Sequence, residues 1–508
     1  MSDTQYAIEL RGITKIFGEI IANDKVDLTV NNGEILALLG ENGSGKTTLM
    51  NILSGIYHPD AGTIKINGKE VVINSPKDSF ALKIGMIHQH FKLVEVMTAF
   101  ENILLGTNNK LNRKKAAEEI KTLCDKFSLK IDLKKRVCNM SVSEKQTVEI
   151  VKVLYRGANI LILDEPTAVL TPQETQNLFE ILRAMKKDGK AVIIITHKLN
   201  EVLEISDRVM ILRKGKSIDS IETAKANAKI LTEAMVGQAI DLEIDRPETE
   251  KEPHALDVRH LSVKGADGRM ALKDVTFDIS SGEILGVAGV AGSGQKELCE
   301  TIAGLHKVEK GAILFKKENI VGKTPSEIIK AGISMSFIPE DRLGMGLVAS
   351  MDITHNMLLK SYKNSKGIFL DRKEAKKLAE DLVEKLSIKT PNVSTPVRLL
   401  SGGNVQKVLI GREIESNPQL LITAYPVRGL DINSSYTIYN LINKQKQNGS
   451  SVLFIGEDLD VLLELCDRIL VLCHGEVMGV VNAREVTKED LGLMMAGQKI
   501  SDGGENNG

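Results

Sequence analysis

The chain has no tryptophan, and aromatic residues make up only 4% of its 508 residues. It also has no apolar run that approaches the roughly 18 residues needed to span a bilayer. Its first residues, MSDTQYAIELRG, contain no basic stretch followed by an apolar one, so we expect no secretory signal peptide. Work at a membrane would therefore require another protein to hold this chain there.

Neither sign of charge predominates, and cysteine is scarce. The 66 basic and 67 acidic side chains give a net charge of -1, which argues against nucleic-acid binding through bulk charge, although a local basic patch stays possible. The five cysteines are an odd number, widely scattered and without a CxxC pair. This pattern favours free thiols in a reducing compartment over disulfides or a zinc site.

The chain contains a long internal repeat. The segment GEIL at 33–36 recurs at 282–285, and each copy leads into a glycine-rich loop, GENGSGKT in the first half and GVAGSGQK in the second. Later, LILDEP (161–166) corresponds to LITAYP (421–426), and AVIIITHKLNEV to SVLFIGEDLDVL. A repeat of this length indicates duplication of a whole domain rather than a short-period solenoid.

The boundary between the halves is predicted at the acidic, proline-containing segment DLEIDRPETEKEP. Such a composition is typical of a short exposed linker. We therefore expect a first domain over 1–240, a linker over 241–254 and a second domain over 255–498. The polar, glycine-rich residues 499–508 are expected to be a disordered tail.

Both halves carry short, nearly continuous apolar runs, such as 160–163 and 192–195. Because these runs do not alternate with polar residues, they predict strands that are covered on both faces of a mostly parallel sheet. Helical patterning over 112–130 and 371–389 lies between the glycine loop and the later strands of each half. The sequence thus predicts an α/β core with an inserted helical subdomain in each half.

The first glycine loop fits the G-x-x-x-x-G-K-[ST] pattern between an apolar strand and a helix. In such a loop the backbone N–H groups and the positive end of the helix dipole face phosphate oxygens. Lys46 would reach the β- and γ-phosphates of ATP, and the Thr47 hydroxyl would coordinate Mg²⁺. The loop residues expected to bind nucleotide are Gly40, Glu41, Asn42, Gly43, Ser44, Gly45, Lys46, Thr47 and Thr48.

Two further strands of the first half end in polar residues that suit the same chemistry. LILDEP places Asp164 where it can hold Mg²⁺ and Glu165 where it can polarise the attacking water. His197 follows the strand AVIIIT and could contact the γ-phosphate. Without the loop upstream, an acidic turn and an ordinary polar strand end would be the simpler interpretations.

Two weaker candidates complete the site. Gln89 in MIHQHF could contact Mg²⁺ and sense the γ-phosphate. Phe17 lies ahead of the loop, where it could stack on adenine, although a phenylalanine more often packs in a core.

These loops in this order, together with LSGGNVQK at 400–407, resemble the ATP-binding cassette (ABC) family over about residues 5–497. The tandem form is similar to the ATPase subunit of sugar-type importers. MIHQHF, PTAVLTPQE and IPEDR resemble the nucleoside and simple-sugar branch, which works with a basic-membrane-protein type binding lipoprotein. The resemblance implies two tandem P-loop NTPase domains, each with an antiparallel β portion beside its parallel core, that use ATP and Mg²⁺.

In this family two cassettes close head to tail on ATP, so each site takes its P-loop from one and its signature loop from the other. The resemblance therefore assigns the site at Lys46 five residues of the second half: Ser401, Gly402, Gly403, Asn404 and Asp431. The second half has lost the corresponding P-loop chemistry. Its substitutions are Gln295 for Lys46, Lys296 for Thr47, Glu297 for Thr48, Ala424 for Asp164, Tyr425 for Glu165, Glu457 for His197, Glu340 for Gln89 and Ala266 for Phe17.

The signature loops are degraded in the opposite sense. The first half has Val142 and Ser143 where the second has two glycines, and side chains there obstruct backbone approach to a phosphate. Thr171 likewise stands where the second half has Asp431. Ser143 and Val427 also depart from the residues common in this branch, both in or beside the degenerate site. The pattern predicts one competent composite site.

The resemblance implies an importer ATPase at the cytoplasmic face of the cell membrane, peripheral and without a membrane span of its own. Its expected partners are two integral-membrane permease subunits, docked beside Gln89 and the helical subdomain of each half, and indirectly a substrate-binding lipoprotein. No nucleic-acid partner is expected. A soluble tandem cassette acting on ribosomes or nucleic acid is the alternative, and a metabolic P-loop kinase would leave LSGGN unexplained. The transported solute, nucleoside or simple sugar, stays open.

Overall fold

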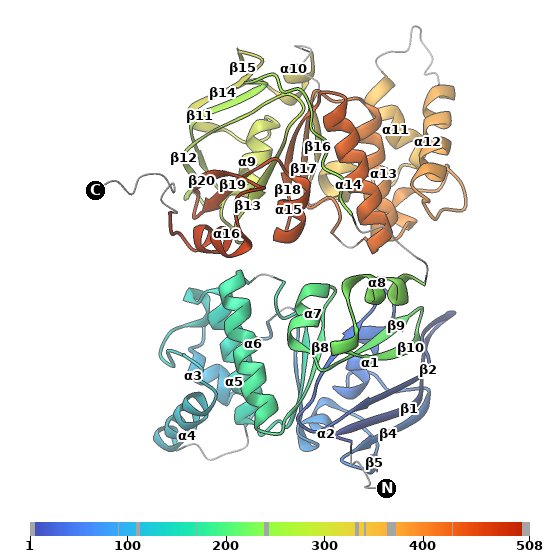
Figure 1. Ribbon diagram of the computed structural model, residues 1–508, viewed down its shortest axis with the longest axis vertical. Helices are drawn as coiled ribbons and strands as arrows, with labels where there is room; N and C mark the ends of the chain where they lie inside the picture. Colours follow the sequence, from blue (N-terminus) through green and yellow to red (C-terminus); the bar gives the residue numbers. More distant parts are fainter. Residues whose placement is uncertain are drawn as a thin grey trace. The chain divides into compact units, whose positions relative to one another are not determined.

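The computed structural model describes residues 6–89, 91–107, 112–168, 170–237, 243–330, 335–339, 342–362, 372–428 and 430–499. The chain divides into two compact units, Met1–Asp241 and Leu242–Gly508 (Figure 1). This division falls inside the segment where the sequence predicts the boundary. Each unit is described separately.

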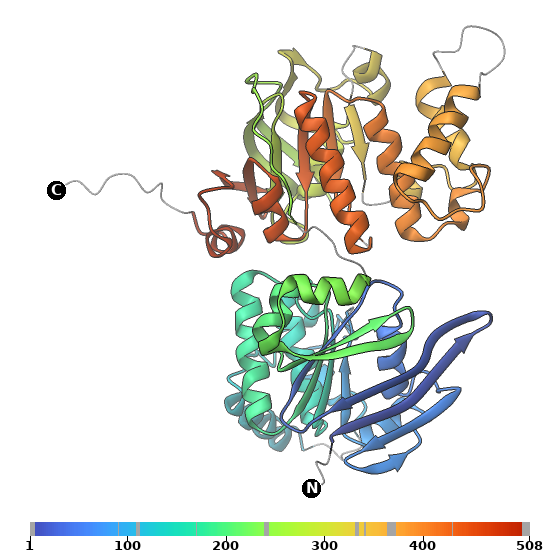
Figure 2. The same ribbon diagram turned by 45° about the vertical axis from the view of Figure 1, so that its right-hand side comes forward.

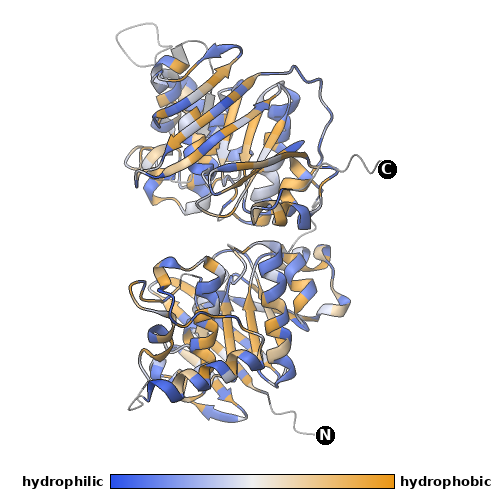
Figure 3. Ribbon diagram, turned by 90° about the vertical axis from the view of Figure 1, so that its left-hand side faces the viewer, coloured by the Kyte–Doolittle hydropathy of each residue, from blue (hydrophilic) through white to orange (hydrophobic). Residues whose placement is uncertain are grey.

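The centre of unit 1 is a six-stranded sheet with the strand order β10-β9-β3-β8-β7-β6. Five strands run parallel and β10 pairs antiparallel with β9 at one edge. All five residues of β3 and of β8 are buried, which explains why their sequences are uninterrupted apolar runs (Figure 3). The strands are β3 (Ile35–Leu39), β6 (Ile84–Ile87), β7 (Ile160–Asp164), β8 (Ala191–Ile195), β9 (Arg208–Arg213) and β10 (Lys216–Glu222).

A second, antiparallel sheet of unit 1 has the order β2-β1-β4-β5. Together with α1 (Lys46–Leu53) it buries apolar side chains against one face of the central sheet, among them Leu10, Leu49 and Ile64. Its strands are β1 (Ile8–Phe17), β2 (Ile20–Val30), β4 (Ala61–Ile66) and β5 (Lys69–Val71). This is the antiparallel portion that the family resemblance implies.

The other face of the central sheet packs on helices (Figure 2). The helical subdomain predicted around 112–130 consists of α3 (Ala99–Leu104), α4 (Arg113–Lys126) and α5 (Val142–Tyr155). Asn112 begins α4 by accepting backbone hydrogen bonds through its side chain, as expected of an N-cap asparagine. The remaining helices are α2 (Pro76–Ala81), α6 (Pro172–Lys187), α7 (Leu199–Ile205) and α8 (Ala228–Val236).

Unit 2 repeats this architecture, with sheets β12-β11-β14-β15 and β16-β17-β18-β13-β19-β20. The predicted α/β class, with two tandem domains, is confirmed. The strands are β11 (Leu256–Lys264), β12 (Met270–Ile279), β13 (Ile284–Ala288), β14 (Val308–Phe315), β15 (Glu318–Asn319), β16 (Met335–Ile338), β17 (Leu420–Ala424), β18 (Ser451–Ile455), β19 (Arg468–Cys473) and β20 (Glu476–Asn482). The helices are α9 (Gln295–Ile302), α10 (Pro325–Lys330), α11 (Ile353–Ser361), α12 (Lys373–Lys385), α13 (Gly402–Glu415), α14 (Ile432–Gln447), α15 (Leu459–Leu465) and α16 (Lys488–Met495). Among the described residues no helix is both long and apolar enough to cross a bilayer.

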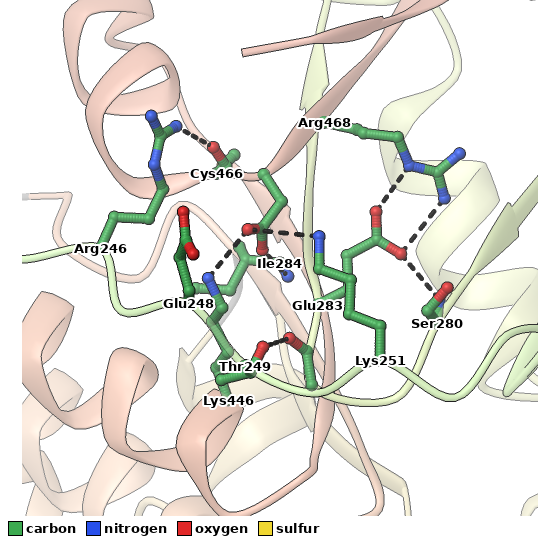
Figure 4. Close-up of polar contacts among 12 residues, drawn as sticks. Arg246, Glu248, Thr249, Lys251, Ser280, Glu283, Ile284, Lys446, Cys466 and Arg468 are labelled. Atoms are coloured by element: carbon green, nitrogen blue, oxygen red, sulfur yellow. Dashed lines mark hydrogen bonds and ion pairs between the residues drawn. The ribbon is translucent and has the colours of Figure 1, made fainter. Parts of the chain in front are cut away.

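The segment expected to be an exposed linker is held on the surface of unit 2 (Figure 4). Ile244 packs against the apolar core of that unit. Arg246 donates to the carbonyls of Leu463 and Cys466 at the end of α15, and the Thr249 hydroxyl donates to the carbonyl of Gly282. Residues 244–252, here called the strap, therefore pack as part of unit 2, whereas residues 500–508 of the expected tail lie outside the described part of the chain.

The strap fits unit 2 because α14 differs from its counterpart α6. In unit 1, Arg183 of α6 donates to the backbone and side chain of Glu204 at the end of α7. The corresponding position of α14 is Asn443, which donates instead to the strap carbonyl of Asp245. Because α14 has no arginine at that position, the guanidinium of Arg246 takes its place at the C-terminal end of α15. A positive charge is favourable at the C-terminus of a helix.

Candidate functional site

The P-loop of unit 1 connects β3 to α1 and holds its lysine folded back on the loop. The Lys46 ammonium donates to the carbonyls of Gly40, at 2.6 Å, and Glu41, at 2.9 Å. Gly45 begins the helix at φ 98°, and a Cβ there would lie 2.3 Å from the carbonyl oxygen of Ala22. Glycine is therefore required at this position.

Burial lowers the pKa of Lys46, against the opposing pull of Glu165, Asp164 and Glu41. The lysine is 8% exposed, yet its described hydrogen-bond acceptors are neutral backbone carbonyls. A buried cation in such a setting gains from an anion, because ionic hydrogen bonds are stronger than neutral ones. The ammonium group of Lys46 is therefore suited to bind a phosphate.

The Ser44 hydroxyl supports the same interpretation. Its oxygen is buried and has no hydrogen-bond partner among the described residues, although buried polar atoms are normally paired. It lies in the loop whose N–H groups precede α1. An unsatisfied hydroxyl beside Lys46 and a helix N-terminus fits a bound phosphate group.

Three side chains of the predicted site meet at the end of β7. The Gln89 amide donates to one oxygen of Glu165 at 2.7 Å, and His197 Nδ1 lies 3.2 Å from the other. Glu165 has φ 47°, a left-handed conformation that turns the chain sharply after Asp164. The structure therefore brings Gln89, Glu165 and His197 together.

The two adjacent carboxyl groups have opposite pKa shifts. Burial, reinforced by Glu165, raises the pKa of Asp164 to about 6, although Lys46 opposes the shift. The hydrogen bond with His197 lowers the pKa of Glu165 despite its burial. Glu165 is thus held ionised, as a base must be, while Asp164 would gain from a cation.

Phe17 lies at the end of β1 and is 41% exposed, so it is not a core residue. Its ring packs edge-on against Tyr57, with centroids 5.2 Å apart, and Lys15 Nζ lies 5.4 Å from its centre. A partly exposed aromatic ring at the end of β1 is compatible with adenine stacking, which stays a prediction. Among the loop residues, Asn42, Gly43 and Thr47 are exposed and Thr48 is half-buried.

Unit 2 keeps the shape of the P-loop without its charge. The Gln295 amide donates to the carbonyls of Gly289, at 2.8 Å, and Val290, at 3.2 Å, reproducing the two bonds of Lys46. Ser293 is buried and, like Ser44, has no partner among the described residues. Lys296 is exposed and pairs weakly with Glu300, at 3.9 Å. Glu340, expected to replace Gln89, lies outside the described residues.

The two signature loops differ in more than their glycines. In unit 1, Ser141 and Glu144 form a reciprocal capping box, and Lys135 bonds the Glu144 carboxylate at 2.7 Å. A carboxylate at the N-terminus of α5 repels a phosphate. In unit 2, Asn404 takes the place of Glu144 and donates to Ser401 Oγ at 2.8 Å, and the Ser401 side chain makes no cap bond. Sequence reasoning had considered the glycines and had missed Glu144, although its position in the repeat was visible.

Asp431 begins α14 by accepting from the Ser434 amide at 2.9 Å and hydroxyl at 2.7 Å. Burial alone would raise the pKa of Asp431. The hydrogen bonds from Ser434 and the charge of Lys407 outweigh burial, so the pKa of Asp431 is lowered overall. Thr171 occupies the same cap position of α6 and bonds Glu174. Lys407, the last residue of LSGGNVQK, was given no role from the sequence; unit 1 has a threonine at its position.

Comparison with known proteins identifies the family. The family model described as "ABC transporter" matches residues 23–168 and 272–426. The chain is 42% identical to the guanosine import ATP-binding protein NupO of Bacillus subtilis strain 168, over 99% of this chain and 100% of that protein. It is 40% identical to the nucleoside import ATP-binding protein NupA of Lactococcus lactis, over 97% and 99%. A ribose import ATP-binding protein of Rubrobacter xylanophilus is 37% identical over 98% and 99%.

Among solved structures, the chain resembles the archaeal ribosome recycling factor aABCE1, crystallised with the ribosomal stalk protein aP1. The TM-score is 0.62 at 19% identity, covering 93% of this chain and 90% of that one. At that identity the likeness concerns the fold alone. The relatives of much higher identity are import proteins, so the ribosomal alternative gains no support.

Proposed function

Because this chain belongs to the ABC transporter family and is the ATP-hydrolysing subunit of an import system, we propose that it turns over ATP at one composite site. That site combines the P-loop around Lys46 with Ser401–Asn404 and Asp431 of the second unit. The observation that carries the proposal is the complementary loss of function in the two units. Unit 1 has Lys46 in its P-loop and an acid, Glu144, in the first turn of its signature helix. Unit 2 has Gln295 in place of that lysine and no acid in the first turn of its signature helix.

In this proposal Lys46 exchanges two carbonyl partners for phosphate oxygens, and the Ser44 hydroxyl gains the partner it lacks. Glu165, held ionised by His197, accepts the proton of the attacking water. Thr47, Asp164 and the carbonyl oxygen of Gln89 would hold Mg²⁺, which neutralises phosphate charge. The raised pKa of Asp164 fits that role, because a neighbouring cation would stabilise the ionised form that burial disfavours.

The partners proposed are two integral-membrane permease subunits, with the chain peripheral at the cytoplasmic face of the membrane. Both units expose apolar side chains on the segments between the Gln89 region and the helical subdomain, where exposed patches mark interaction sites. In unit 1 these are Val94 and Val96; in unit 2 they are Leu343, Met345, Val348 and Met351. An extracytoplasmic binding lipoprotein would join the complex through the permeases.

A paired mutagenesis experiment tests the single-site proposal. Lys46→Ala should lower ATP turnover by a factor of about 10² or more, whereas Gln295→Ala should leave most of it. A glutamate at the signature position of unit 2, Gly403→Glu, should abolish turnover, whereas the matched Ser143→Glu in unit 1 should not. Equal losses within either pair would refute a single composite site.

The transported solute is proposed to be a nucleoside, because the two import relatives named at 40% identity or above carry nucleosides in their names. The test is uptake by cells that express the chain with the permeases encoded beside it. Guanosine uptake that depends on Lys46 is expected. Lys46-dependent uptake of ribose without nucleoside uptake would assign the chain to simple-sugar import, and recovery of no membrane partner in a pull-down would contradict the permease proposal.

A further inference from the structure

The arginine that ends the IPEDR segment, to which no role is assigned above, joins two loops of unit 2. Arg342 opens a short helical turn, η3 (Arg342–Gly346), that follows β16. One guanidinium nitrogen donates to the carbonyl of Gly402 at 3.0 Å, and another donates to the carbonyl of Arg428. Gly402 belongs to the signature loop, and Arg428 lies in the loop that leads to Asp431. A single side chain thus spans both loops that the proposed site takes from unit 2.

The turn that carries Arg342 is itself fixed against α13, the helix that the signature loop begins. Arg412 of α13 donates to the carbonyl of Gly346 at 2.7 Å and is held by the neighbouring Glu413. A Cβ on Gly346 would come within 2.8 Å of the Leu409 side chain, so the turn sits tightly on the helix. The amide of Leu347 donates to the carbonyl of Arg342, a five-residue π-type bond that is frequent at functional sites.

Arginine suits this position because its planar fork presents several N–H donors at fixed angles. A lysine would have to reach both carbonyls from a single nitrogen, whereas the guanidinium reaches them from two separate nitrogens. An alanine would remove the link between the loops. Gly402 contributes by having no side chain, since a Cβ there would lie 3.2 Å from the guanidinium. The glycine therefore admits Arg342 to the backbone of the signature loop.

Unit 1 has neither half of this arrangement. When the corresponding strands β6 and β16 of the two units are aligned, Phe91 stands at the position of Arg342. Val142 stands at the position of Gly402. The arginine thus occurs in the unit whose signature loop is intact. The same turn also exposes Leu343 and Met345, which belong to the apolar surface proposed to meet a permease.

We propose that Arg342 is a positioning residue that fixes the signature loop and the Asp431 loop relative to each other, and so sets the geometry in which they meet ATP. The inference rests on the proposed composite site. It also gives the permease a route to that site, because a displacement of the turn would move the guanidinium and with it both loops.

The test compares Arg342→Ala and Arg342→Lys with Arg398→Ala in the full chain. Arg398 is an exposed arginine three residues ahead of the signature loop, and its side chain makes no hydrogen bond among the described residues. Arg342→Ala should lower kcat about tenfold or more, the effect of losing hydrogen bonds from a charged donor. Nucleotide affinity, measured by binding to the chain in the Glu165→Gln background, should stay near normal because Lys46 lies in unit 1. Arg342→Lys should recover part of the loss.

Hydrogen exchange without nucleotide supplies a readout independent of activity. Arg342→Ala should speed exchange of the amides at 401–406 and 430–434 and leave the P-loop amides of unit 1 unchanged. Normal kcat together with unchanged exchange would overturn the proposal, as would a kcat loss matched by Arg398→Ala or by a general fall in thermal stability. If Gly403→Glu also leaves turnover intact, the composite site itself fails; if only Arg342→Ala is silent, the positioning role alone fails.

Discussion

Replacing Asp164 by asparagine should stabilise the nucleotide-free first unit at pH 7 while it abolishes ATP turnover. The reason is that Asp164 is half-buried and its pKa is raised from the ordinary value of 3.8 to about 6. Ionising it is therefore harder in the folded state than in the unfolded state. Each unit of pKa corresponds to about 1.4 kcal/mol, so the ionised carboxylate destabilises unit 1 by about 3 kcal/mol.

The pH dependence has a defined sign. Well below the ordinary pKa of 3.8 the carboxyl is protonated in both states, and the group costs nothing. As the pH rises from about 4 to about 6 the unfolded state loses its proton first, so the stability of unit 1 falls and then stays level. Asp164→Asn removes this loss, and its advantage over the wild type should grow from near zero at pH 4 to about 3 kcal/mol at pH 7.

The assay is urea denaturation of the nucleotide-free chain at several pH values, with the transitions of the two units followed separately. Unit 2 serves as an internal control, because Ala424 stands at the position of Asp164 and its transition should not move. Mg²⁺ and ATP should stabilise the wild type more than the variant. The reasoning would be refuted if Asp164→Asn were less stable than the wild type at pH 7. It would also be refuted if the gain in stability were the same at every pH.

Two further expectations concern single contacts. His197→Ala removes the main cause of the lowered Glu165 pKa, so the acid limb of the residual ATPase pH profile should move to higher pH; an unmoved limb would mean that this bond does not tune the base. Arg246→Ala should lower the stability of unit 2 by about 2 kcal/mol, since two hydrogen bonds from a charged donor at a helix end are lost. Arg484→Ala, which among the described side chains breaks the exposed pair with the strap residue Glu248, should cost about 0–1 kcal/mol. Equal effects of the two variants in urea denaturation would contradict the role assigned to Arg246.

The sequence was sufficient for features that local patterns encode. The P-loop could be located because its glycines, Lys46 and the flanking strand and helix are contiguous, and the buried strands could be located because burial on both faces demands unbroken apolar runs. The start of α4 at Asn112 follows from capping chemistry. The candidate roles of Glu165 and Gln89 depended on the P-loop found upstream of them, and the structure adds that their side chains meet.

What the sequence did not reveal are contacts to backbone carbonyls from distant side chains. Arg342 and Arg246 both donate to carbonyl oxygens, and a carbonyl carries no residue signature. The strap illustrates this limit, because its polar composition is that of a free linker while its docking depends on Asn443, some 200 residues away. Glu144 could be read from the sequence, but its position in the first turn of α5 became clear only from the capping box that it forms with Ser141.

The strap has a practical consequence for anyone who wishes to produce the second cassette alone. A fragment that starts near residue 255, where the first strand begins, would remove Arg246 from the end of α15 and Lys251 from Asp467, which it approaches to 3.5 Å. The Lys446 ammonium, now fully buried beside Asp467, would lie under an uncovered surface. The expression boundary should therefore be set at Leu242 or before, so that the fragment includes the strap that covers this surface.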